Sequence, residues 1–423
     1  MKWLLKAASA VALSAGLMAP QASAAENDVD AAQADISKVS YAKEVSRLIQ
    51  ARCETCHRPE GIAPFSMTNY RQVRGWAKMI KEVINDGRMP PWHADPRYGH
   101  FKNDRRLTEH ELALFNAWLD NGMAKGDDAD LPEPANYGGE WRVGTPDIVL
   151  VQPEEVTIDP TGVVPYMYFT QDPGFKEDIY VTAAEALAGN IKVVHHIIVT
   201  WFLPEGVNKE YPGQREGFLI GTAPGDMPLL TEPGQARLIP AGAHLRWQMH
   251  YTPTGKVEKD QSRLGLMTTK EMPAELIMTN SPGQYQLDIP PHAENHMVET
   301  TYTTPQDIRI VSFMPHMHLR GKAYRYEVKY PDGREEILLD IPKYDFNWQA
   351  TYRLTEPKFL PKGTQVHLVA HFDNSDKNPY NPDPNKNVHW GDQTWEEMMI
   401  GWHDFVIKRE DLAQVEKTSL SGD

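Results

Sequence analysis

Closely spaced histidines in apolar stretches are the residues of this sequence best suited to chemistry. His316 and His318 stand two apart in VSFMPHMHLRGK (residues 311–322), and His195 and His196 are adjacent in VVHHIIV (residues 193–199). Residues two apart on a β-strand project from one face, so His316 and His318 can hold one metal ion without distorting the backbone. The adjacent pair would need a local bulge to do the same. Imidazole nitrogen suits copper, zinc, iron or nickel.

Two other residues can complete these pairs. His250 ends the apolar stretch 245–251 and would give a three-histidine set with His195 and His196. Met398 lies in TWEEMMIG (residues 394–401), and a thioether beside imidazoles suits copper that cycles through Cu(I). A methionine there is more often a core filler, and a lone H-x-H often only faces solvent. Their occurrence together favours two copper sites.

A third motif, Cys53-Glu54-Thr55-Cys56-His57, contains both cysteines of the chain. C-x-x-C-H is the attachment signature of c-type haem, with the thiols bonded to the porphyrin and the histidine available to the iron. A disulfide would not explain the histidine, and a zinc site would require further cysteines. By analogy with cytochromes c, Met89 in the proline-held loop GRMPPWH (residues 87–93) is the expected sixth ligand. His93 is the rival.

The surrounding patterns predict a fold class: a small all-α cytochrome c domain followed by two all-β antiparallel, jelly-roll-like sandwiches. Apolar residues recur every three or four positions across residues 73–84, which predicts an amphipathic helix. Thr108 with Glu111 predicts a capping box at the start of a further helix. Beyond the linker, short apolar runs alternate with turn residues. We expect a haem domain at 39–128, a linker at 129–142, a first sandwich at 143–272 and a second at 273–415.

The start of the chain predicts export. Lys2 and Lys6, the apolar run 7–18 and Ala22-Ser23-Ala24 are typical of a signal peptide at 1–24, cleaved near Ala24. A polar tether (25–38) follows, and 416–423 is a tail. Without the two lysines the formal charge goes from −15 to −17, which argues against nucleic acid and anionic membranes as partners. No later segment reaches membrane-spanning length, so we expect a periplasmic protein.

Taken together, the β-rich region resembles the copper type II, ascorbate-dependent monooxygenases, the family of peptidylglycine α-hydroxylating and dopamine β-monooxygenases. The resemblance covers roughly residues 143–408. It implies two copper sites. His195, His196 and His250 match, in order and context, the ligands of the electron-transfer copper. His316, His318 and Met398 match those of the catalytic copper.

The sequence departs from this family in its pocket and in its cysteines. The β-rich region has no cysteine, whereas the animal enzymes are rich in disulfides. Met314 stands where peptidylglycine enzymes have the arginine that grips a substrate carboxylate, and Trp402 stands where they use a tyrosine. The resemblance therefore implies an apolar or aromatic-lined substrate pocket rather than one for a peptide carboxylate.

The expected function is copper-dependent hydroxylation of a C–H bond in a small apolar or aromatic substrate by O₂. Electrons would come through one covalent haem c from a periplasmic donor, which could be a cytochrome, a quinol-linked protein or a small reductant. The alternative is a non-enzymatic electron carrier or copper-binding protein on the same scaffold. Oxygen consumption with product formation separates these two hypotheses.

Overall fold

The computed structural model describes residues 36–59, 61–135, 137, 140–207, 215–222 and 228–410. The expected signal peptide, nearly all of the tether and the 416–423 tail lie outside the described residues. Within the described ranges, no helix is both long enough and apolar enough to cross a membrane.

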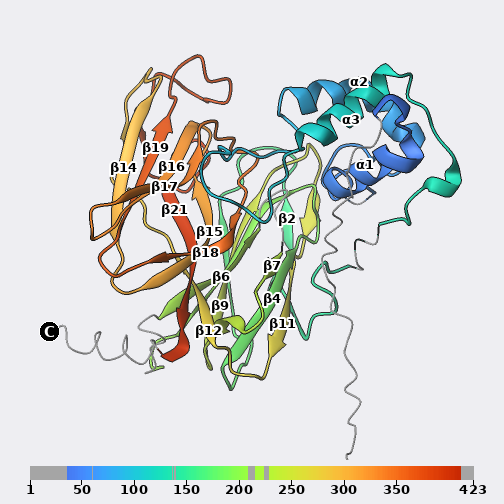
Figure 1. Ribbon diagram of the computed structural model, residues 1–423. Coiled ribbons are helices and arrows are strands. Elements are labelled where there is room, and N and C mark those ends of the chain that lie inside the picture. Colours follow the sequence, from blue (N-terminus) through green and yellow to red (C-terminus); the bar gives the residue numbers. More distant parts are fainter. Residues whose placement is uncertain are drawn as a thin grey trace, which may run out of the picture.

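Three α-helices form a small unit near the amino end (Figure 1). They are α1 (Ser46–Arg52), α2 (Tyr70–Asn85) and α3 (Glu109–Asp120). Asn69 caps α2 through its side chain, and Thr108 and Glu111 form the predicted capping box at α3. The apolar faces of the helices meet around Ile49, Val73 and Trp118, which are almost completely buried.

The predicted fold class is wrong, because the helices are not a separate all-α cytochrome c domain. The chain is mostly β, with 38% strand and 13% helix. Between α2 and α3 the chain leaves the helices and packs into the β-structure. Trp92 is 6% exposed in the core of the carboxyl-terminal sandwich, 4.8 Å from the ring of Tyr352, and Phe101 forms a β-bridge with Leu354. The aromatic residues of this loop find the burial there that a three-helix unit is too small to give them.

The first sandwich consists of two antiparallel sheets that share one core. One sheet contains β1 (Ile148–Val151), β11 (Arg263–Thr269), β4 (Ile179–Leu187) and β8 (Gln235–Ile239), with β7 (Leu229–Leu230) beside β4. The other contains β3 (Met167–Gln171), β9 (His244–Tyr251), β5 (Val194–Phe202) and β6 (Glu216–Thr222). A short pair, β2 (Val156–Ile158) and β10 (Glu258–Asp260), accompanies them. Alternate residues of β9 are buried, as expected of a strand with one face on a core.

The second sandwich is built in the same way. One sheet contains β12 (Glu275–Asn280), β21 (Ile400–Lys408), β15 (Ile308–His316) and β18 (Tyr352–Leu360). The other contains β14 (His296–Thr303), β19 (Gln365–Phe372), β16 (Gly321–Lys329) and β17 (Glu335–Ile341), and a short pair joins β13 (Asp288–Ile289) to β20 (Val388–His389).

The two sandwiches are continuous with each other, which is a second departure from the predicted fold class. β8 pairs with β12 in parallel, through Gln235 with Glu275 and Ala236 with Leu276. This pairing joins one sheet of each sandwich into a nine-stranded sheet. A shared sheet fixes the orientation of the two halves, so side chains from both can line one site.

Candidate metal centres and the cavity beside them

His195, His196 and His250 come together on neighbouring strands. His196 on β5 pairs with His250 on β9, and the register shifts between Val194 and His196. This irregularity is the bulge that the adjacent histidines required, because it lets both rings turn to one side. One ring nitrogen from each histidine lies within 4.8 Å of the others, a spacing that a single metal ion could bridge.

The surroundings keep these imidazoles neutral and available. Burial lowers the pKa of His195; burial, together with the neighbouring His195, lowers that of His250 to about 3. The Nδ1 atoms of His195 and His250 are buried without a hydrogen-bond partner among the described residues. A buried polar atom without a partner is costly, and a metal ion would satisfy it. The Nε2 of His196 lies 3.2 Å from Gln248 Oε1, which holds that ring in place.

His316 and His318 form the second cluster, at the end of β15 rather than within it. His316 is the last residue of the strand and His318 lies in the turn that follows. His316 Nδ1 is 2.6 Å from Gln349 Oε1, and His318 Nδ1 is 3.2 Å from the carbonyl of Glu396. Each ring therefore keeps Nε2 for a metal. Indeed, Nε2 of His318 is buried and has no partner among the described residues.

A buried carboxyl group ties Met398 to this cluster. Glu397 is fully buried and accepts the backbone N–H of His318 at 2.8 Å and that of Arg320 at 2.6 Å. Met398 follows directly and is partly exposed, whereas Met399 is fully buried in the sandwich core. Burial raises the pKa of Glu397 to about 8, against the two N–H donors, which favour its ionised form. This contact places the backbone of Met398 beside His318.

The two clusters face each other across one aromatic ring. Phe346 stacks on His195, with ring centroids 5.5 Å apart and planes at 13°, and stands perpendicular to His318 at 6.1 Å. The loop that carries Phe346 also supplies Gln349 and Tyr344, whose hydroxyl is 3.0 Å from the backbone nitrogen of Met317. One loop thus contacts both candidate metal centres.

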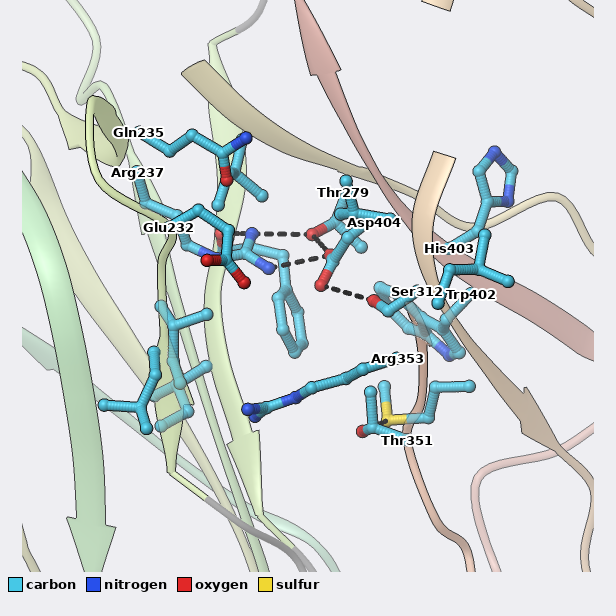
Figure 2. A pocket seen from close by; sticks show the side chains of 18 of the residues that line it. Glu232, Gln235, Arg237, Thr279, Ser312, Thr351, Arg353, Trp402, His403 and Asp404 are labelled. Carbon is cyan, nitrogen blue, oxygen red and sulfur yellow. Dashed lines mark hydrogen bonds and ion pairs between the residues drawn. The ribbon is translucent and has the colours of Figure 1, made fainter. Parts of the chain in front are cut away.

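Met314 and Trp402, the residues expected to line a substrate pocket, line the same cavity. Its volume is about 330 Å³, and it lies between β6 and β8 of the first sandwich and β12, β15, β18 and β21 of the second. Figure 2 shows Arg353 lying across it, with Trp402 on the side of the second sandwich. Met314 pairs with Trp402 across β15 and β21, two residues before His316.

The haem motif follows α1. Cys53 and Cys56 are both free thiols, and burial raises the pKa of Cys53 to about 12. His57 Nδ1 lies 3.0 Å from the carbonyl of Phe65, which leaves Nε2 for an iron. Beside this histidine, Phe65 stacks on Trp76 at 4.4 Å, and Trp76 is 40% exposed although it is apolar. An exposed apolar surface next to the motif fits a porphyrin.

The two candidates for the sixth haem ligand lie in different surroundings. The backbone nitrogen of Met89 is 3.1 Å from the carbonyl of Val83, at the end of α2. His93 is close to Asp345, and its backbone hydrogen-bonds to Tyr352 of β18. The backbone of Met89 therefore stays with the helices, whereas His93 belongs to the sandwich side, and Met89 as the sixth ligand stays a prediction.

Several residues at these sites were not predicted from the sequence. Tyr166 contacts two of the histidines, with its ring 5.1 Å from His196 and 4.6 Å from His250. Nothing in the sequence indicated that Phe346 and Arg353 lie at these sites, because neither belongs to a recognised motif. Glu397 could have been noticed, since it stands directly before Met398 in TWEEMMIG (residues 394–401).

Comparisons with known proteins do not assign the chain to a family. No protein-family model and no curated protein matches it significantly. Among solved structures, the major capsid protein of bacteriophage PM2 is similar at a TM-score of 0.26 and 9% identity, over 57% of this chain and 99% of that one. The VP2 subviral particle of infectious bursal disease virus is similar at a TM-score of 0.20 and 8% identity, over 64% of this chain and 74% of that one. Likenesses this weak carry no argument about function.

Proposed function

We propose that the protein is an exported copper-dependent monooxygenase that hydroxylates a C–H bond of a small molecule with an apolar or aromatic body. The observation that carries the proposal is the placement of two neutral histidine clusters on either side of Phe346, one of them next to a cavity. An electron carrier would need the histidines but not the cavity two residues from His316.

The donor sets fit copper at both clusters. His195, His196 and His250 would hold one ion through imidazoles alone, and His316, His318 and Met398 would hold the other through imidazole and thioether. When bound, copper would supply one-electron redox chemistry and activation of O₂. Overall, substrate, O₂, two electrons and two protons give alcohol and water.

The chain's own residues would orient and seclude the reaction. Gln248 and Gln349 fix one ring in each cluster through hydrogen bonds at 3.2 and 2.6 Å. Glu397 holds the turn at His318. The ring of Phe346 fills space between the clusters, and Met314 and Trp402 would position the apolar body of the substrate.

Cys53 and Cys56 would hold a covalent haem c, with His57 and Met89 as ligands to its iron, and the chain would then be its own reductase. The group would supply one-electron transfer from a periplasmic donor. The loop after Met89 supports this, because it runs from α2 into the sandwich core at Trp92 and Tyr352, on the side of the clusters.

Metal analysis and oxygen uptake on the full chain test the proposal. Protein loaded with Cu(II) and freed of excess metal should hold two coppers, and the His195→Ala and His316→Ala variants should each hold one. With a reductant and substrate, oxygen consumption should match alcohol formed. Two coppers and reversible haem oxidation without hydroxylation of any tested compound would favour the electron carrier. Absence of copper binding would exclude both hypotheses.

A further inference from the structure

A row of polar side chains crosses one sheet of the first sandwich and ends at the three-histidine cluster. Tyr168 of β3 lies directly opposite Gln248 of β9. His196 of β5 pairs with His250, which stands two residues after Gln248, so Gln248 and His196 project from the same face of the sheet. Gln248 therefore lies between Tyr168 and His196, and its amide can contact both of them.

Hydrogen bonds join these side chains into one chain that leaves the first sandwich. Gln248 Oε1 lies 3.2 Å from His196 Nε2, and Gln248 Nε2 donates to the hydroxyl of Tyr168 at 3.0 Å. The Tyr168 hydroxyl in turn donates to Oδ2 of Asp392 at 3.4 Å. Asp392 belongs to the second sandwich, in the segment between β20 and β21. The chain thus starts at a proposed metal ligand and ends on a carboxylate from the other half of the molecule.

The segment that carries Asp392 is held by contacts within the second sandwich. Glu396 accepts the backbone N–H of Gln393 at 3.0 Å, and a Cβ on Gly391 would overlap the Glu396 carboxylate. Asp392 lies between these two contacts. The carbonyl of Glu396 is also 3.2 Å from His318 Nδ1, so the same segment reaches the second cluster. The second sandwich therefore fixes the place of Asp392 beside the first.

The carboxylate at the end of the chain decides which way each hydrogen bond points. A carboxylate only accepts, so the single hydroxyl proton of Tyr168 goes to Asp392. The Tyr168 oxygen can then only accept from Gln248, which must present its NH₂ group there. The amide oxygen of Gln248 consequently faces His196 and accepts from Nε2–H. Without the carboxylate the opposite direction would be equally open, with the NH₂ group donating to an unprotonated Nε2.

We propose that Asp392 is a positioning residue for the three-histidine centre, because it selects the tautomer of His196 through the intervening hydrogen bonds. A proton on Nε2 leaves Nδ1 of His196 unprotonated and able to bind a metal ion. Nδ1 is also the buried atom that has no hydrogen-bond partner, among the described residues, in His195 and His250. The selection of the tautomer is independent of the proposed function, and its effect on copper binding rests on that function.

The ¹⁵N spectrum of the histidine rings in the copper-free full chain tests the selection. Proton–nitrogen correlations within the ring distinguish the two neutral tautomers, and the His196 signals are those lost in His196→Gln. We expect the parent protein to carry the His196 proton on Nε2. Asp392→Asn keeps the shape of the side chain but can donate as well as accept, and Tyr168→Phe removes the hydroxyl. Both variants should show a mixture of the two tautomers.

Copper affinity is the second measurement, made in the His316→Ala background, where the three-histidine site is the one proposed to remain. Tyr168→Phe and Asp392→Asn should each weaken Cu(II) binding about tenfold, as is usual when an outer partner of a metal ligand is lost. Adding Asp392→Asn to Tyr168→Phe should cause little further loss, because both act through the same chain. Tyr168 is 51% exposed, so its replacement leaves the sandwich core intact.

Asp332→Asn is the matched control, because Asp332 is exposed and pairs with Arg334 in the turn after β16. It removes the same charge and should keep the tautomer and the affinity of the parent protein. A proton on Nδ1 of His196 in the parent protein would overturn the proposal. So would an unchanged tautomer in Asp392→Asn, even with weaker copper binding, since that would be an effect of charge alone.

Failure of this inference is distinguishable from failure of the proposed function. If the tautomer shifts in the variants but the parent chain binds no copper, the monooxygenase proposal fails and the role of Asp392 in the tautomer stands. If copper binds at both clusters and the tautomer of His196 does not respond to Asp392→Asn, the role of Asp392 fails and the monooxygenase proposal stands.

Discussion

The ring of Phe346 lies parallel to that of His195, 5.5 Å away, although the two residues belong to different sandwiches. The other contact of Phe346, with His318 at 6.1 Å, makes it the side chain shared by both histidine clusters. A ring in this position excludes water from the space between two centres that would exchange electrons, and exclusion of water suppresses side reactions.

Removal of this ring should uncouple oxygen reduction from hydroxylation. Phe346→Ala keeps every proposed ligand, so we expect two coppers per chain as in the parent protein. Hydroxylation should fall roughly tenfold to a hundredfold, as is usual when a group around a metal is lost. Hydrogen peroxide should appear in place of product. The measurement is the ratio of peroxide to alcohol per O₂ consumed. Phe359→Ala, at a position 53% exposed on β18, is the control and should leave the ratio unchanged.

Glu397 should position the turn at His318. Glu397→Gln replaces one of the two accepting oxygens by an N–H donor, so one backbone N–H loses its partner, at a cost of about 1–3 kcal/mol. The second copper should then bind roughly tenfold to a hundredfold more weakly. Titration against a chelator measures both affinities. The three-histidine site of the same molecule is the internal control, and weakening of both sites together would mean general unfolding instead.

Met398 and Met399 should respond oppositely to the same substitution. Met398→Ala removes the proposed sulfur ligand from a partly buried position, so hydroxylation should stop while the three-histidine copper and the haem remain. Met399→Ala truncates a core residue, which should cost about 2–5 kcal/mol of stability and leave the sulfur ligand in place. Cu(I) X-ray absorption should show a sulfur neighbour in Met399→Ala and none in Met398→Ala. A Met398→Ala variant that still hydroxylates at the parent rate would remove the main support for the catalytic site.

Covalent haem should depend on the two thiols and on nothing in the sandwiches. Cys53→Ala with Cys56→Ala should abolish haem staining on a denaturing gel. The β-structure should persist, because the cores around Ile197 and Phe313 contain no residue of the helices. Circular dichroism checks this, with Cys53→Ser and Cys56→Ser as the conservative variants. Haem that survives denaturation in the double variant would contradict the assignment.

The sequence predicted the residues of the two clusters better than the fold that carries them. His195 and His196 are adjacent in the sequence, and His316 and His318 are two residues apart. Their proximity in space therefore follows directly from the sequence. The capping box at Thr108 was predicted for the same reason. The burial of Trp92 and Phe101 in the second sandwich was not predicted. Their loop has no hydrophobic periodicity, so the sequence does not indicate which core its aromatic residues will join.

The cavity depended on strand pairing that no local pattern reveals. Arg353 reaches the face of β15 because the register shifts between Ile310 and Ser312, which sets the residues of β18 that lie opposite. The parallel pairing of β8 with β12 likewise places Arg237 next to Asp404. A sequence shows that these side chains are charged, but the partner of each charge follows from the tertiary structure.

His403 allows a test of the electrostatics away from the proposed ligands. It is 1% exposed on β21, and burial lowers its pKa to about 4 from an ordinary value of 6.5. The unfolded chain therefore takes up a proton at this residue as the pH falls below 6.5, while the folded chain does not until about pH 4. The free energy of unfolding must therefore decrease as the pH is lowered from 6.5 to about 4, and this contribution stays constant below about pH 4. The shift corresponds to roughly 3 kcal/mol for this one residue.

His403→Gln should remove this contribution, because a glutamine does not titrate. We expect the free energy of unfolding of the variant to depend less on pH between 6.5 and 4 than that of the parent protein. Urea unfolding of the metal-free chain at a series of pH values measures both slopes. Val257→Ala, at a position 62% exposed, is the control, because neither valine nor alanine has a titratable side chain and the slope should stay as it is. Parallel curves for the parent protein and His403→Gln would show that His403 titrates normally in the folded state.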